Sequence, residues 1–307
     1  VFFIVLGIFL IAHHPAASTH YWHLSDGPFH GGLATMFSVF ILSGFSFQGT
    51  ELVGIAAGEA KDPQQSLPRA IKNVFWRILL FYVGTLLIIS LLIPFTDPKL
   101  LNSQESVALS PFTLIMHQAQ FFHGASVLNA IILLALLSAC NSDLYSATRI
   151  LFHLSQAKQA PSIFSRLNRF HIPIWALLAT ASFGILAVLL QQFGSNGVFL
   201  WLGNISSLAG FIAWFGIALS HYRFRAHYLQ SGNALENLPF KAPWYPIAPL
   251  IALSLTSIVI LGQAYVLYMQ HQPNAMMLLS NYIGLIIVLM LYVGHRYRMR
   301  KTTQVLA

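Results

Sequence analysis

Long apolar stretches recur along this chain of 307 residues, and they constrain its fold more than any other feature. After a short apolar segment at 1–12, continuous stretches fall near 33–57, 74–95, 125–148, 173–193, 198–220, 246–268 and 278–295. A helix needs ~20 apolar residues to cross a bilayer, and each of these later stretches is about that long. A transmembrane barrel would instead alternate in polarity over ~10-residue segments. The sequence therefore predicts an all-α, polytopic helical membrane protein.

The composition agrees with that prediction. Only 8% of the residues are charged and 56% are hydrophobic, with a mean hydropathy of +0.68, whereas soluble domains carry roughly 25% charged residues. This excludes a cytosolic enzyme, a secreted disulfide scaffold and a disordered regulator. No GxxxxGK, HExxH, GxSxG or CxxC pattern occurs, and Cys140 is the single cysteine. We therefore expect neither enzyme chemistry nor a cofactor nor a metal site.

The basic residues indicate an orientation. All of the 16 Lys and Arg residues except Lys99 fall in the connections after 33–57, 125–148 and 198–220 or in the C-terminal tail. These connections alternate with others that are nearly free of basic residues, and the positive-inside rule places the basic side in the cytoplasm. The C-terminus is thus predicted to be cytoplasmic. The net charge of +8 then needs no nucleic-acid partner.

Histidines gather in the connection 13–32, on the predicted outer side. They are common metal ligands, but their spacing is irregular and no cysteine accompanies them. We interpret the segment as a solvated loop, with metal binding as the alternative. The histidines concerned are His13, His14, His20, His23 and His30.

The stretch 33–57 is interrupted by glycines and polar residues. Gly44, Gly49 and Gly54 share it with Gln48, Thr50 and Glu51, and Gly58 follows directly after it. In lipid, backbone polar groups must be satisfied internally, and transporters place binding sites at discontinuous helices. The pattern therefore predicts a broken helix. Close packing of a neighbouring helix is the alternative explanation for Gly49 and Gly54.

That alternative does not explain a carboxylate at mid-membrane. Placing Glu51 there costs from ~3 to above 10 kcal/mol, and such residues are functional candidates by default. For Glu59, nearer the predicted cytoplasmic edge, a salt bridge or helix-end role stays open beside a transport role.

A second polar cluster lies near the end of the stretch 125–148. Asn141, Tyr145 and Thr148 follow i, i+4, i+7 spacing and share a helical face, which Ser142 and Asp143 widen. For Asp143, pairing with Arg149 and contact with a ligand both stay open. A third patch, Asn204 with Ser206 and Ser207, is explained by interhelical hydrogen bonds or by a functional role.

Four segments resemble the amino-acid permeases of the amino acid–polyamine–organocation superfamily, in particular the bacterial lysine-specific permeases. They are FSFQGTELVGIAAGE, LPRAIKNVFWRILLFYV, SACNSDLYSATRILF and FIAWFGIALSHYRFR, in this order. The resemblance implies an inverted five-plus-five repeat of helices with two more appended, in the inner membrane of a bacterium. The segment 1–12 then corresponds to the end of the fifth helix, 33–220 to the second repeat and 246–295 to the two appended helices, all within one permease domain, 1–307.

The resemblance also implies a substrate site. Phe45 corresponds to the aromatic lid, the unwound backbone to Ser46, Phe47, Gln48 and Gly49, and the acidic position to Glu51, which some relatives link to protonation. The eighth helix of the family contributes Asn141, Asp143 and Tyr145. Position 143 is often small in the lysine permeases, and its carboxylate here either meets a cationic substrate or changes specificity.

The function implied is proton-coupled import of lysine or another cationic amino acid by alternating access, with the amino acid, H⁺ and the lipid bilayer as partners. A neutral amino-acid permease and an exchanger are alternatives within the superfamily. The family's helices 1–4 have no counterpart in the sequence, so the further alternative is an inactive membrane fragment.

Overall fold

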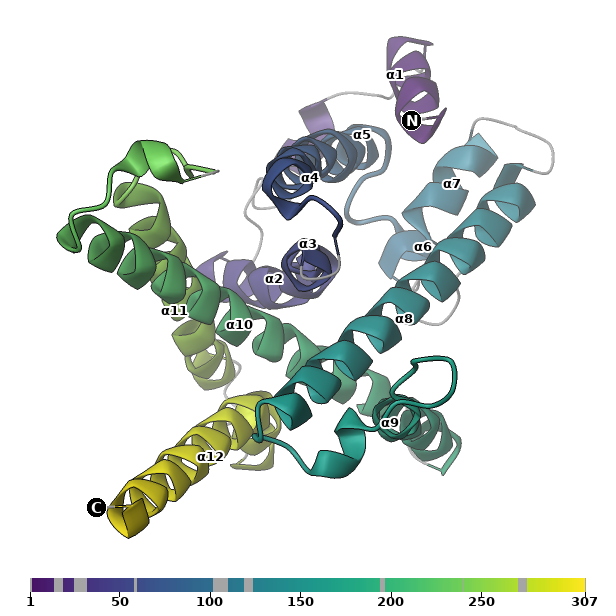
Figure 1. Ribbon diagram of the computed structural model, residues 1–307. Helices are drawn as coiled ribbons and strands as arrows, with labels where there is room; N and C mark the ends of the chain where they lie inside the picture. The colour runs from purple at the N-terminus through teal and green to yellow at the C-terminus, as the bar shows by residue number, and fades with distance from the viewer. Residues whose placement is uncertain are drawn as a thin grey trace. The chain divides into compact units, whose positions relative to one another are not determined.

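The computed structural model describes residues 2–13, 19–24, 32–57, 60–101, 110–118, 124–193, 197–238, 240–269 and 275–306. These residues form helices and connections without any strand, as the labels in Figure 1 show. The all-α prediction is therefore confirmed. The chain divides into two compact units, Val1–His30 with Ser66–Tyr145 and Gly31–Gln65 with Ser146–Ala307. The single permease domain stays a prediction.

The first unit packs α1 (Phe2–His13) and α7 (Pro111–Gln118) against α5 (Gly84–Leu92). Its buried core joins Ile88 and Leu92 of α5 to Leu114 and Ile115 of α7, with side chains of α1 packed against it. Gly7 of α1 lies directly against the Ile88 side chain, since a glycine lets two helices approach closely. The unit also holds η1 (Thr19–His23), most of α4 (Pro63–Arg77), the π-helix η3 (Ile78–Val83), α6 (Pro98–Leu101) and α8 (Gly124–Gln156) up to Tyr145.

The second unit is built around α10 (Gly197–Gln230), which packs against α2 (Gly32–Phe47), α11 (Ile247–Met269) and α12 (Ala275–Leu306). Figure 1 shows the long green α10 beside α11. On its buried face lie Ser207, Leu208 and Phe211. The unit also contains α3 (Leu52–Ala56), η6 (Ser162–Ser165), α9 (Ile174–Phe193) and η7 (Leu235–Asn237).

Large apolar side chains cover the outside of these helices. Leu134 exposes 67% of its surface, Phe183 75% and Leu261 70%. Exposed apolar area is unfavourable in water by roughly 25 cal/mol per Å², but in a bilayer it faces hydrocarbon. Within the described residues, four helices are long and apolar enough to span a membrane: Pro63–Leu92, Ser126–Gln156, Ile205–Gln230 and Ile247–Tyr265. The chain is a multi-pass membrane protein.

The helices extend beyond the apolar stretches that predicted them. Arg69 and Lys72 lie on α4, and Arg223 and Arg225 lie on α10, so their placement in loops is wrong. Arg and Lys are good helix formers, and their polar side chains end the hydrophobic signal without ending the helix.

Candidate functional site

The stretch 33–57 forms two helices with a break between them. α2 ends at Phe47, a turn covers 48–51, and α3 begins at Leu52. Gly49 has φ +93°, a left-handed conformation that costs a residue with a Cβ about 1–2 kcal/mol. The Leu52 N–H then donates to the Gly49 carbonyl across 3.2 Å. The predicted interruption is confirmed, and Gly49 supplies the backbone conformation that the turn requires.

The Glu51 carboxylate lies at this break and accepts hydrogen bonds from three donors. Its Oε1 atom accepts from the Gly49 backbone N–H (3.3 Å), and its Oε2 atom from the Thr50 hydroxyl (3.4 Å). Oε2 also accepts from the indole Nε1–H of Trp214 at 3.1 Å. The side chain is half-buried. The turn and α10 together thus supply the hydrogen-bond donors that this carboxylate requires.

Trp214 is a site residue that the sequence reasoning did not single out. It lies on α10 and packs edge-to-face against Phe211, with ring centroids 5.3 Å apart and planes at 82°. Phe211 in turn is buried against Gly44 of α2. Ser207, Phe211 and Trp214 follow i, i+4, i+7 spacing, so they share one helical face. That spacing is the signal that could have identified Trp214.

Gln48, at the start of the turn, is bonded to the same helix. Its Nε2–H donates to the Ser206 carbonyl, and the Ser206 hydroxyl donates to Gln48 Oε1 at 3.0 Å. Gly210 leaves room for this side chain, because a Cβ at Gly210 would collide with the Gln48 amide. The expected interhelical hydrogen bonds of the third polar patch are thus confirmed for Ser206. The side chain of Asn204 lies outside the described residues.

The glycines of the stretch 33–57 differ in which atoms lie beside them. Gly49 has only the Leu52 Cδ1 atom within 4 Å of where its Cβ would stand, and Gly54 has no described atom there. Within the described residues no neighbouring helix approaches either glycine, and close packing stays an untested alternative for both. Gly44 is the glycine of this stretch that a neighbouring helix approaches closely, because a Cβ there would meet the Phe211 ring.

The other predicted residues of the break lie in the last turn of α2 or outside the described residues. Ser46 and Phe47 belong to the last turn of α2, where Ser46 is exposed and Phe47 half-buried. Phe45 belongs to the same turn, and its side chain lies outside the described residues. Glu59 also lies outside them. The structure thus joins Gln48, Gly49 and Glu51 to α10, and the lid role of Phe45 stays a prediction.

The α8 cluster belongs to the first unit, whereas the break belongs to the second. Asn141, Ser142, Asp143 and Tyr145 are exposed on α8, and the Ser142 hydroxyl donates to the Ser138 carbonyl at 3.0 Å. Their contact with a substrate stays a prediction.

Thr148, the third residue of the predicted face, lies in the second unit and is buried. Its hydroxyl bonds the Thr180 hydroxyl of α9 at 3.0 Å, so its role is interhelical.

The histidine segment is described in part. His13 ends α1, with its Nδ1 atom 2.9 Å from the Phe9 carbonyl oxygen, and His20 and His23 are exposed on η1. His14 and His30 lie outside the described residues. Within the described part of the chain, no group of three His, Cys, Asp or Glu side chains could hold a metal ion.

Comparison with known proteins decides the family. The family described as "Amino acid permease" matches residues 1–307. The chain belongs to the amino acid permease family. This permease is 44% identical to the lysine-specific permease LysP of Escherichia coli over 96% of its own length and 61% of that protein. It is 42% identical to the histidine permease HisP of Lactococcus lactis, over 88% of this chain and 56% of the relative.

The lysine-specific permease LysP of Lactococcus lactis is 40% identical, over 88% of this chain and 54% of the relative. The permease chain thus spans between about half and three fifths of the length of these relatives. No solved structure matches it. The predicted family is confirmed.

Proposed function

We propose that this permease chain belongs to a transporter that imports lysine or another cationic amino acid by alternating access. The observation that carries the proposal is the Glu51 carboxylate at the break between α2 and α3. A carboxylate in apolar surroundings attracts a cation strongly, by about 4 kcal/mol at 4 Å for an effective dielectric constant of 20. The names of the relatives, lysine-specific and histidine permeases, support a cationic substrate.

The donors around Glu51 suggest how a substrate would be recognised. An ammonium group offers hydrogen bonds that replace those of Thr50 and Trp214 on the same carboxylate. The turn 48–51 also leaves backbone groups outside regular helix bonding, and such groups bind the polar ends of substrates in transporters. Phe45 would cover the bound substrate, and substrate binding by Asn141, Asp143 and Tyr145 of α8 stays part of the proposal.

Proton coupling is part of the same proposal. Glu51 is the residue that we propose to link transport to protonation, because its carboxylate lies at the break where the substrate would bind. The basic connections support a cytoplasmic C-terminus, and the bacterial relatives support the inner membrane as the location. Family membership also permits a neutral amino-acid permease or an exchanger, and an inactive chain is the remaining alternative.

The test is uptake of radiolabelled lysine by cells that lack their own lysine transporters and produce the protein from its complete reading frame. Glu51→Gln keeps the shape and removes the charge, and we expect it to lower uptake at least about tenfold, because hydrogen bonds to charged groups contribute ~1.5–3 kcal/mol. Glu236→Gln changes an exposed carboxylate and serves as the control at equal expression.

Competition and counterflow separate the alternatives. Unlabelled lysine, arginine and histidine should compete with labelled lysine, whereas leucine should not. Uptake that leucine abolishes would indicate a neutral permease, and acceleration by preloaded substrate would indicate an exchanger. Uptake by Glu51→Gln equal to that of the unchanged protein at every pH would overturn the role of Glu51.

A further inference from the structure

The connection between α10 and α11 is clamped onto the end of α10 by one arginine. The Arg225 Nη1–H donates to the Ala242 carbonyl at 2.8 Å, and the guanidinium lies 4.6 Å from the centroid of the Tyr245 ring. Tyr245 also donates its hydroxyl to the Tyr222 carbonyl at 3.2 Å. The clamp thus fixes residues 242–245 against the last turns of α10.

The clamp leaves part of the Arg225 side chain unsatisfied. Arg225 exposes only 9% of its surface, and its Nε–H has no hydrogen-bond partner among the described residues. The bond from Nη1 goes to a neutral carbonyl, so that acceptor does not balance the buried charge. Buried polar groups in proteins are nearly always bonded, and buried charges are paired with an opposite charge. An anionic acceptor is therefore the partner that this site lacks among the described residues.

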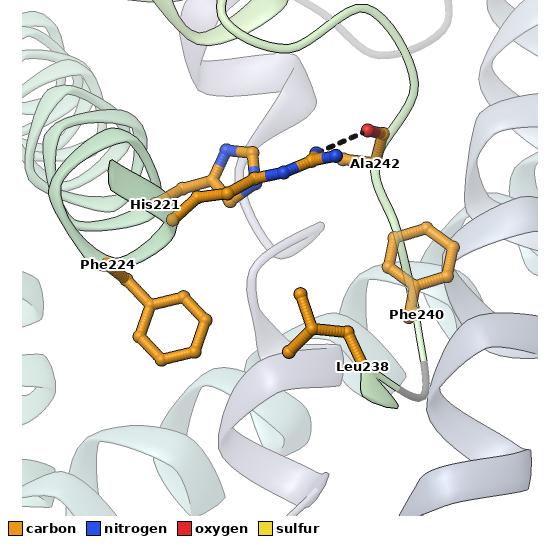
Figure 2. A pocket seen from close by; sticks show the side chains of 6 residues that line it. His221, Phe224, Leu238, Phe240 and Ala242 are labelled. Atoms are coloured by element: carbon orange, nitrogen blue, oxygen red, sulfur yellow. Dashed lines mark hydrogen bonds between the residues drawn. The ribbon is translucent and has the colours of Figure 1, made fainter. Parts of the chain in front are cut away.

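A cavity of about 190 Å³ lies beside the guanidinium. Its lining combines the cation with apolar side chains from α10 and from the connection: His221, Phe224, Arg225, Leu238, Phe240 and Ala242. In Figure 2, Phe224 on the helix and Leu238 and Phe240 on the connection surround the space beside the bond to Ala242. The lining suits a molecule that carries a negative group and an apolar portion.

The position of the cavity points to the source of that molecule. Arg225 lies five residues, or ~7.5 Å of helix, before the end of the candidate span Ile205–Gln230. Trp244, next to the clamp, exposes 79% of its surface, and exposed tryptophans concentrate at the level of the lipid headgroups. Two exposed basic residues, Arg223 and Lys241, are close to Arg225 or Trp244 in the sequence. The same segment has one exposed carboxylate, Glu236 on η7, so its net charge is positive. Basic pockets at this level bind anionic headgroups.

We propose that this cavity binds an anionic phospholipid. The lipid phosphate would accept hydrogen bonds from the Arg225 guanidinium, including its Nε–H. The glycerol and the first acyl carbons would lie along Phe224, Leu238 and Phe240. This site does not depend on the transport mechanism proposed above.

The test is the thermal midpoint of the detergent-purified protein, measured with increasing phosphatidylglycerol and, separately, phosphatidylcholine or inorganic phosphate. We expect phosphatidylglycerol to raise the midpoint and the other two to have little effect. Arg225→Gln should weaken the apparent affinity for phosphatidylglycerol about tenfold, as loss of a charged hydrogen bond does. Arg223→Gln, which removes an exposed charge two residues away, should change it less than about twofold.

A second variant keeps the clamp intact. Leu238→Trp fills the cavity while Arg225 and its bond to Ala242 are left unsubstituted, and it should abolish the phosphatidylglycerol effect while the midpoint without lipid is retained. Unchanged affinity in both Arg225→Gln and Leu238→Trp would overturn the proposal. Equal stabilisation by inorganic phosphate would also overturn it, because the ligand would then be a free anion and not a lipid.

Discussion

Trp214 on α10 donates its indole Nε1–H to the Oε2 atom of Glu51 across 3.1 Å, although 163 residues separate them in the sequence. The bond connects the carboxylate at the break between α2 and α3 to the helix that forms the centre of the second unit. Together with the bonds between Gln48 and Ser206, it ties both ends of the turn 48–51 to α10.

We expect Trp214→Phe to reduce lysine uptake about tenfold. The substitution keeps an aromatic ring against Phe211 but removes one of the three donors to Glu51. The substrate would then compete with fewer donors, bind more tightly by up to the ~1.5–3 kcal/mol of a hydrogen bond to a charged group, and leave more slowly. Uptake at equal surface expression is the measurement, with Trp244→Phe as the control because Trp244 is largely exposed. Equal uptake by the two variants would contradict a role for the indole N–H.

Gly49→Ala and Gly54→Ala should affect stability in opposite directions. Gly49 has φ +93°, so a Cβ there should lower the free energy of unfolding by about 1–2 kcal/mol. Gly54 lies within α3 with open space at its Cβ position, and alanine stabilises helix interiors by roughly 0.5–1 kcal/mol relative to glycine. Detergent-driven unfolding of both variants is the measurement. Equal effects of the two substitutions would show that the left-handed turn is absent.

Gly210→Ala and Gln48→Ala should be strongly non-additive. A methyl group at Gly210 collides with the Gln48 amide, and such overpacking costs about 1–3 kcal/mol. Truncation of Gln48 removes the colliding atoms, so the double variant should be more stable than the sum of the two losses predicts. A double-mutant cycle on the unfolding free energy measures the coupling. A coupling energy near zero would mean that the two residues do not meet.

Fusions should report a cytoplasmic C-terminus. Basic residues Arg296, Arg298, Arg300 and Lys301 lie at the end of α12, and the positive-inside rule keeps such residues in the cytoplasm. A fluorescent protein fused after Ala307 should therefore fluoresce, and alkaline phosphatase at the same position should be inactive. Phosphatase fused after Thr96, on the predicted outer side, is the control. An active phosphatase at Ala307 would reverse the proposed orientation.

The hydrophobic pattern predicted every long helix among the residues that the structure describes, because lipid selects continuous apolar stretches. It misplaced the start of α4 and the end of α10. Hydropathy reports which residues contact hydrocarbon, whereas these helices continue through polar residues such as Arg69 and Arg225. The break was predictable because glycines beside Gln48 and Glu51 contradict a uniform span.

The partners of those residues were not predictable. Whether a glycine receives a neighbouring side chain or adopts a left-handed turn depends on tertiary packing, so Gly44 and Gly49 look alike in the sequence. The contact between Glu51 and Trp214 depends on how α10 docks against α2, which the local pattern does not encode.

The three donors on Glu51 have a consequence for turnover. The chain itself already supplies hydrogen bonds to the Glu51 carboxylate, so a substrate ammonium that binds there as proposed would exchange one set of hydrogen bonds for another and gain only the difference. Such an exchange would favour turnover in a transporter. A buried carboxylate without other hydrogen-bond donors would bind the cation so tightly that dissociation would be slow. Thr50 and Trp214 would then take the place of the substrate on the carboxylate. The free energy of the site without substrate would thus be close to its free energy with substrate bound.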